Sequence, residues 1–309
     1  SNLEASYQIS LSGRRGPTHL TIPTNLQSQS YDKNDMSFQS RINGSSVINP
    51  DFSHQKIIEY LKKSSNPIII LGNGAHDVLS DEIINLVETL NIPILTEMSA
   101  RGIIPDSHYL CFGLSDQRAN PIARVISESD LVILLGKELD FTLDFGNHPV
   151  ISKSSYIIQV DPDEQILSRS KRADLSILSS VGNFVSQIVR NLNYYKDYKK
   201  SPDILKSLEI ESQNHHSSLE KYRNDIESIH SMDIHFALNK MLDEKSCMVF
   251  EGSDFAFYGA SYYPANERDR WFVNGVLGMI GWGVPFGIGA KVALPDEEVI
   301  VFTGDGASG

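Results

Sequence analysis

Short apolar runs that alternate with amphipathic segments constrain the fold of this chain more than any other feature. Four runs predict buried strands, at 67–71, 92–95, 131–135 and 156–160. Helical patterns at 83–90 and 119–126 stand between them. Strands that alternate with helices form parallel sheets, because each crossover returns the chain to the same edge. We therefore predict an α/β fold with a doubly wound parallel sheet as its central domain, over residues 51–190.

A second strand–helix–strand unit begins at residue 230. The runs 247–250 and 299–302 predict strands, and a glycine-rich loop and helix lie between them. Each strand ends in a turn that contains glycine, Glu251-Gly252-Ser253 in the first case and Gly304-Asp305-Gly306 in the second. Residues 230–309 therefore predict part of a second α/β domain, and the polar stretch 191–229 predicts a linker.

The first fifty residues have a different character. Residues 11–23 predict a turn and one short strand, and 24–50 are rich in Ser, Asn and Gln without apolar periodicity, as in an extended linker. A lone strand cannot bury itself. We therefore expect this strand to need a sheet that the chain does not visibly supply.

Charge and cysteine content exclude several classes of protein. The formal net charge of −12 argues against a nucleic-acid binder. Cys111 and Cys247 form no disulfide or metal-ligand pattern, which favours a reducing compartment. Residues 271–290 carry no charge over the length of a membrane span, but six glycines and Pro285 favour a loop and a buried helix. We expect neither a nucleic acid nor a membrane as a partner.

The turn Gly304-Asp305-Gly306 carries the strongest chemical signal. The Asp305 carboxylate follows a predicted strand, and ligands of α/β proteins bind at the carboxyl ends of strands. Flanking glycines let a phosphate approach the main chain, and a carboxylate oxygen suits Mg²⁺ that bridges a diphosphate. These three residues leave one alternative open, an Asp-Gly turn that closes a hairpin.

Four stretches of the sequence, taken together, distinguish this turn from a chance match to a cofactor-binding motif. They are Gly13-Arg-Arg-Gly-Pro17 with His19-Leu-Thr-Ile-Pro23; residues 67–161; Gly275-Val-Leu-Gly-Met-Ile-Gly-Trp-Gly-Val-Pro285; and Gly304-Asp305-Gly306. Their order and spacing resemble the thiamine-diphosphate enzymes of the acetolactate synthase group. This group includes acetolactate synthases, oxalyl-CoA decarboxylases, 2-hydroxyacyl-CoA lyases and benzaldehyde lyase.

The resemblance covers nearly the whole chain and implies how it is divided. Residues 1–50 would be the end of a pyrimidine-binding domain and a linker, and 51–190 a central Rossmann-like domain. Residues 191–229 would be a second linker, and 230–309 the amino-terminal part of a diphosphate-binding domain.

The resemblance also assigns roles around the diphosphate. Asp305 would bind the Mg²⁺ of the cofactor. The diphosphate would lie against Gly304, Gly306, Ala307 and Ser308, with Gly252 and Ser253 closing over it. Asp254 departs from the family pattern, because a carboxylate repels a nearby phosphate.

Two further residues would hold the rings of the cofactor. The resemblance implies that the Gly278 carbonyl accepts a hydrogen bond from the aminopyrimidine and that Ile280 lies beneath the bent cofactor. Without the resemblance, close helix packing at Gly278 and an ordinary core position for Ile280 are the simpler interpretations. The glutamate that activates the cofactor in this family would lie before residue 1. We therefore name no catalytic residue and expect this chain alone to be inactive.

The central domain carries an incomplete nucleotide-binding fingerprint. Gly72-Asn73-Gly74 follows a predicted strand, and Asp161 ends another, where a carboxylate suits a ribose hydroxyl. A further glycine that would complete the fingerprint is missing. Enzymes of this group use the domain for FAD or for an ADP-like moiety of CoA, or leave it empty. We favour an empty site, with FAD or ADP as the alternative.

The sequence leads to one functional hypothesis and two rivals. The leading hypothesis is a carbon–carbon lyase or synthase, dependent on thiamine diphosphate and Mg²⁺, that acts on a small 2-oxo acid or 2-hydroxyacyl substrate. We expect a cytoplasmic homodimer or homotetramer. The rivals are a non-catalytic module that binds an adenine nucleotide and a structural fragment with an unoccupied Asp305 turn.

Overall fold

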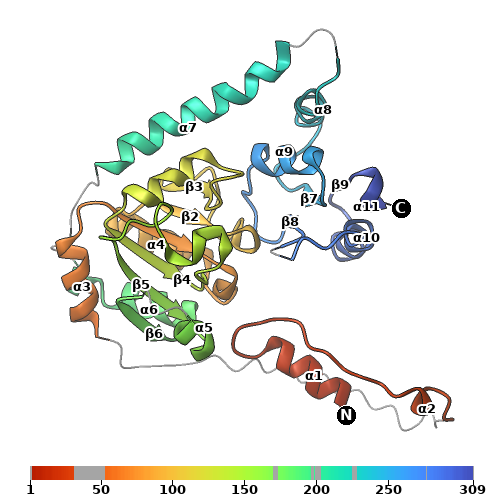
Figure 1. Ribbon diagram of the computed structural model, residues 1–309, viewed down its shortest axis with the longest axis horizontal. Coiled ribbons are helices and arrows are strands. Elements are labelled where there is room, and N and C mark those ends of the chain that lie inside the picture. Colours follow the sequence, from red (N-terminus) through yellow and green to blue (C-terminus); the bar gives the residue numbers. More distant parts are fainter. Residues whose placement is uncertain are drawn as a thin grey trace.

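Two parallel sheets, one of six strands and one of three, organise the chain (Figure 1). The computed structural model describes residues 2–30, 53–169, 173–195, 198, 203–224, 228–275 and 277–308. Helices pack on both faces of the larger sheet. The predicted α/β class and the doubly wound central sheet are therefore confirmed.

The six-stranded sheet has the order β3-β2-β1-β4-β5-β6, and all neighbouring strands run parallel. Its strands are β1 (Pro67–Leu71), β2 (Ile94–Thr96), β3 (Cys111–Leu114), β4 (Leu131–Leu135), β5 (Tyr156–Asp161) and β6 (Leu175–Leu178). The order of the strands reverses between β1 and β4. This topological switch point is where doubly wound sheets bind ligands.

Alternating side chains of the central strands feed two cores. Ile69 and Leu71 of β1 face one core, and Ile68 and Ile70 face the other. The first core is covered by α3 (His54–Lys63), α4 (Ser80–Leu90) and α6 (Val181–Arg190). The second is covered by the 3₁₀ helices η4 (Pro121–Glu128) and η5 (Phe141–Gly146) and by α7 (Ile204–Glu220). Shorter helices complete this part: η2 (Asn73–Ala75), η3 (Met98–Ala100), α5 (Glu164–Arg169), η6 (Leu192–Tyr195) and η7 (Lys221–Asn224).

The sequence analysis did not predict the two edge strands of the larger sheet, β3 and β6. The strand β3 contains Gly113, whose φ of 78° interrupts the β pattern, and β6 has only four residues with a serine among them. Both are short and weakly patterned, so their place at the sheet edges comes from tertiary packing. The helix predicted at 119–126 is the 3₁₀ helix η4, which begins when the Asn120 side chain accepts the Ile122 N–H.

The smaller sheet has the order β8-β7-β9. Its strands are β7 (Cys247–Phe250), β8 (Trp271–Val273) and β9 (Val299–Phe302), and its helices are α8 (Ser231–Leu238), α9 (Asp254–Tyr262), α10 (Gly283–Ala293) and α11 (Asp305–Ser308). Part of the uncharged stretch 271–290 is therefore strand, which the sequence analysis missed. Among the described residues, no helix combines the length and apolarity that a membrane crossing needs.

The strand predicted within residues 11–23 is wrong. The described residues 2–30 contain the helices α1 (Asn2–Leu11) and α2 (Thr24–Gln27), with no strand between them. No described strand pairs with this segment. The linker predicted at 24–50 contains α2, and residues 31–50 lie outside the described residues. The predicted linker 191–229 contains α7, whose Ile204 and Leu208 pack on the central domain.

Candidate functional site

The predicted cofactor-binding residues lie on three loops at the carboxyl edge of the smaller sheet, except Ala307 and Ser308, which follow the third loop in α11. We define the first loop as residues 251–253 after β7, the second as 274–275 and 277–282 after β8, and the third as 303–306 after β9. The loops touch one another. A Cβ placed on Gly252 would lie 2.9 Å from Cγ2 of Ile280, and one placed on Gly304 would lie 3.1 Å from Cβ of Ser253. Glycine at both positions therefore permits this close approach.

The third loop presents Asp305 to solvent. Asp305 is exposed and begins α11, and no described atom would meet a Cβ on Gly306 within 4 Å. The N–H groups of Ala307 and Ser308 donate to the Gly304 carbonyl at 3.1 and 3.0 Å. An exposed carboxylate beside open glycine backbone is the arrangement expected for a metal that carries a phosphate group. No cluster of three or more metal-ligating His, Cys, Asp or Glu occurs among the described residues.

The first loop begins α9. Ser253 Oγ accepts the N–H of Ala256 at 3.1 Å, so Ser253 is the helix N-cap and its hydroxyl hydrogen can still donate. Asp254 occupies the first turn of α9, where a carboxylate interacts favourably with the positive end of the helix dipole. The departure of Asp254 from the family pattern therefore has a local structural reason.

The second loop is open and apolar. Gly275, Gly278 and Gly281 have φ values of 63°, 61° and 85°, which favour glycine, and no described atom lies within 4 Å of a Cβ placed on any of them. Ile280 is 57% exposed and Leu277 is 91% exposed. The two simpler interpretations are therefore wrong: Gly278 does not serve close helix packing, and Ile280 is not a core residue.

Sequence analysis missed a buried carboxylate at the centre of these loops. Glu251, at the end of β7, is fully buried. Its carboxylate accepts hydrogen bonds from the backbone N–H of Trp282 at 2.6 Å and from the Thr303 hydroxyl at 2.9 Å. Burial raises the pKa of Glu251, but these hydrogen bonds outweigh it and hold the pKa below its usual range. The available signal was an acidic residue that directly follows an apolar strand.

The switch point of the central sheet holds an arginine from the start of the chain. The guanidinium of Arg14 pairs with the buried carboxylate of Asp161 and donates to Asn73 Oδ1. Burial raises the pKa of Asp161, and Arg14 opposes this shift. A Cβ on Gly72 would overlap the backbone of Gly136, so this glycine serves close packing. Asp161, which we expected to accept a ribose hydroxyl, therefore already has a cationic partner, and nothing in this arrangement supports FAD or ADP.

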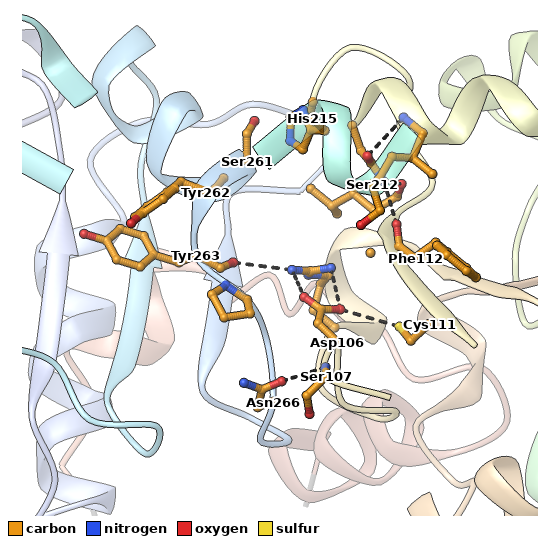
Figure 2. Close-up of a pocket in the computed structure, with 18 residues that line it drawn as sticks. Asp106, Ser107, Cys111, Phe112, Ser212, His215, Ser261, Tyr262, Tyr263 and Asn266 are labelled. Atoms are coloured by element: carbon orange, nitrogen blue, oxygen red, sulfur yellow. Dashed lines mark hydrogen bonds and ion pairs between the residues drawn. The ribbon is translucent and has the colours of Figure 1, made fainter. Parts of the chain in front are cut away.

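A cavity of about 340 Å³ lies elsewhere, between the two domains (Figure 2). None of the predicted cofactor-binding residues lines it. Arg101 and Asp106 form an ion pair on its wall, with Arg101 Nη1 2.9 Å from Asp106 Oδ1 (Figure 2). Burial, together with the nearby Asp106 carboxylate, raises the pKa of the Cys111 thiol, so this cysteine is a poor nucleophile. The Cys111 thiol therefore gives no support for catalysis in this cavity.

Comparison with known proteins identifies two domains in the chain. Residues 54–188 match the family model "Thiamine pyrophosphate enzyme, central domain", and residues 252–309 match "Thiamine pyrophosphate enzyme, C-terminal TPP binding domain". Thiamine pyrophosphate is another name for thiamine diphosphate. The second match includes Gly252, Ser253, Asp305 and the stretch that joins them.

Individual relatives point to the same family. The chain is 27% identical to a probable acetolactate synthase large subunit of Methanococcus aeolicus, over 98% of this chain and 53% of that protein. It is 25% identical to the acetolactate synthase large subunit of Lactococcus lactis, over 97% and 52%. It is 29% identical to human 2-hydroxyacyl-CoA lyase 2, over 82% and 40%. The chain thus spans about half the length of the curated acetolactate synthases it matches. The two matched domain models, together with the α/β fold, show that the chain belongs to the thiamine-pyrophosphate enzymes.

Proposed function

We propose that the complete protein is a lyase or synthase that uses thiamine diphosphate and Mg²⁺ to cleave or form a carbon–carbon bond. Its substrate would be a 2-oxo acid or a 2-hydroxyacyl compound. One observation carries the proposal: the first and third loops meet at the carboxyl edge of the sheet, with exposed Asp305 beside Ser253 and unobstructed glycine backbone. The match to acetolactate synthases and 2-hydroxyacyl-CoA lyases supports the reaction class.

The residues present fit this cofactor. Asp305 would bind Mg²⁺, and Gly306, where no described atom lies within 4 Å of a Cβ position, leaves room for the diphosphate. The remaining diphosphate contacts would come from Gly252, Ser253, Gly304, Gly306, Ala307 and Ser308. The positive φ and open surroundings of Gly278 suit a carbonyl that faces a ligand, and the exposed Ile280 side chain provides an apolar support for a ring system.

The coenzyme and this chain would have different roles in the reaction. When bound, thiamine diphosphate supplies a nucleophilic carbon that adds to a carbonyl and accepts the electron pair of the broken bond. This chain orients the coenzyme and surrounds it with fixed dipoles. Glu251 is unsuited to proton transfer, because its carboxylate is buried and already accepts hydrogen bonds from Trp282 and Thr303. We therefore propose that Glu251 is not the glutamate that activates the cofactor.

We further propose that the site is completed at an interface between copies of the protein in a homodimer or homotetramer. Apolar side chains of the second loop and of α10 are exposed, among them Leu277 at 91%, Met279 at 66% and Val292 at 78%. Surfaces of this kind mark contacts with other chains. Light scattering on the complete protein should give a mass of two or four subunits, and a monomer that binds the cofactor would contradict this assembly.

We also propose a cytoplasmic location. Both cysteines are buried free thiols, as expected in a reducing compartment. Cell fractionation with an antibody against the protein tests this location, and enrichment in an extracellular or membrane fraction would contradict it.

Calorimetry on the complete protein tests the cofactor. We expect binding of thiamine diphosphate that requires Mg²⁺, and an Asp305→Ala variant should lose it. Asp296→Ala is a matched control, because Asp296 is an exposed aspartate in the turn before β9, away from the three loops. Unchanged cofactor binding by Asp305→Ala would contradict the proposal. Binding of ADP or FAD without thiamine diphosphate would instead support the non-catalytic nucleotide module.

A further inference from the structure

A single buried carboxylate touches the segments that carry the proposed cofactor site. Glu251 belongs to the first loop and has no exposed surface. It is adjacent in sequence to Gly252 and Ser253, and its side chain reaches both other loops. No predicted cofactor contact involves Glu251 itself, so any influence on the cofactor would be indirect.

The contact with the second loop fixes where that loop ends and α10 begins. Glu251 Oε1 accepts the N–H of Trp282 at 2.6 Å. A Cβ on Gly283 would lie 2.7 Å from Glu251 Oε2, so only glycine lets the helix approach this closely. The carboxylate thereby holds the end of the loop that carries Gly278 and Ile280.

The contact with the third loop is of a different kind. Thr303 Oγ1 donates to Glu251 Oε2 at 2.9 Å, and Thr303 directly precedes the turn that presents Asp305. This hydrogen bond joins β7 to the end of β9 and contributes nothing to capping α10. A residue that only capped the helix would not need it.

We propose that Glu251 is a positioning residue for the thiamine-diphosphate site, because its one carboxylate links all three cofactor-binding loops. This role rests on the proposed function. The charged acceptor makes stronger hydrogen bonds than a neutral one, and its buried position keeps water from competing for the donors. The spacing between the Asp305 turn and the second loop is thereby set before the cofactor binds. The consequence is measurable as cofactor affinity.

Two substitutions in the complete protein test the two contacts separately. Glu251→Gln keeps the shape but removes the charge and one acceptor, and Thr303→Val removes the hydroxyl that donates to Glu251 and that also lies 3.4 Å from the Gly304 carbonyl oxygen. We expect each to raise the Kd for thiamine diphosphate with Mg²⁺ about tenfold, the scale seen when groups behind metal ligands are removed. Thr303→Ser, which retains the hydroxyl, should restore the affinity. Both variants weaken the hydrogen bond between Thr303 and Glu251, so their effects should not add. The Kd of the double variant should therefore be only slightly higher than the higher of the two single-variant Kd values.

A matched control separates positioning from general stability. Asp233 caps α8, where its carboxylate accepts the His230 N–H at 2.9 Å, and it lies outside the three loops. Asp233→Asn should lower the Tm and leave the Kd unchanged, whereas Thr303→Val should raise the Kd at a temperature well below its Tm. If Glu251→Gln does not fold, the Kd of Thr303→Val for thiamine diphosphate still tests the positioning role.

The outcomes distinguish this role from the proposed function. If the unaltered protein binds no thiamine diphosphate with Mg²⁺, both proposals fail. If the unaltered protein binds it and Thr303→Val binds equally tightly, the positioning role alone fails. A Kd that rises in Glu251→Gln and Thr303→Val and recovers in Thr303→Ser supports it.

Discussion

The ion pair between Arg101 and Asp106 should be the most sensitive point of the contact between the two domains. Arg101 is 4% exposed and Asp106 is 13% exposed, so neither charge is well solvated. Asp106 also accepts the backbone N–H of Ala265 at 2.8 Å and donates its own N–H to the Ala265 carbonyl at 3.0 Å. One carboxylate therefore neutralises a buried guanidinium and holds a loop of the second domain.

Asp106→Ala leaves that guanidinium without its partner. Removing one member of a buried pair costs about 3–5 kcal/mol. The adjacent cavity of about 340 Å³ can admit water to Arg101, which favours the lower end, about 3 kcal/mol. Glu138→Ala is the matched control, since Glu138 pairs with Arg169, which is 63% exposed, and an exposed pair contributes at most about 1 kcal/mol.

Urea unfolding followed by tryptophan fluorescence measures this difference. The guanidinium of Arg101 lies 4.9 Å from the Trp271 ring centroid, so the signal arises beside the altered pair. The double variant Arg101→Met with Asp106→Leu should recover much of the loss, because it leaves no buried charge. The reasoning would be refuted if Asp106→Ala were no less stable than Glu138→Ala, or if the double variant were as unstable as Asp106→Ala.

Three further predictions follow from packing and burial. Gly287→Ala should destabilise the protein by about 1–3 kcal/mol, because the new Cβ in α10 would overlap Cγ2 of Val301. Gly289→Ala is the control: its Cβ would lie in open space, so this change should be neutral or stabilising by up to about 1 kcal/mol. The urea midpoints of the two variants measure the difference. Burial lowers the pKa of His235, so below the unfolded pKa of about 6.5 the unfolded chain gains the proton first, and stability should fall as the pH drops from 7.5 to 5.5. His235→Phe should flatten that dependence, and an equally steep curve would contradict this origin. Burial raises the pKa of both cysteine thiols, so a thiol reagent at pH 7.5 should label them slowly in the native protein and rapidly in urea, and fast native labelling would contradict their burial.

The strands that sequence reasoning finds are those with a strong local signal. In β1 and β4 every residue is apolar and buried, so the pattern alone identifies them. The strand β8 has three residues inside a long uncharged stretch, and its boundaries depend on pairing with β7. The strand predicted near residue 20 shows the opposite error. Its local pattern is suitable, but no described strand pairs with it.

The candidate site divides in the same way. Asp305 and its glycines are recognisable because the turn directly follows a strand. Glu251 is not, since its hydrogen-bond partners Trp282 and Thr303 lie 31 and 52 residues away. The pair of Arg14 with Asp161 spans 147 residues. Contacts of this range depend on topology, which local patterns do not encode.

The insertion of Arg14 at the switch point of the central sheet has a consequence for any nucleotide that approaches it. Arg14 and Asp161 belong to one chain, so the guanidinium acts as a tethered competitor with a high effective concentration. A free nucleotide has to displace this competitor before its ribose can reach the carboxylate. Any ligand that required the Asp161 carboxylate would therefore compete with an arginine that the amino-terminal segment holds in place.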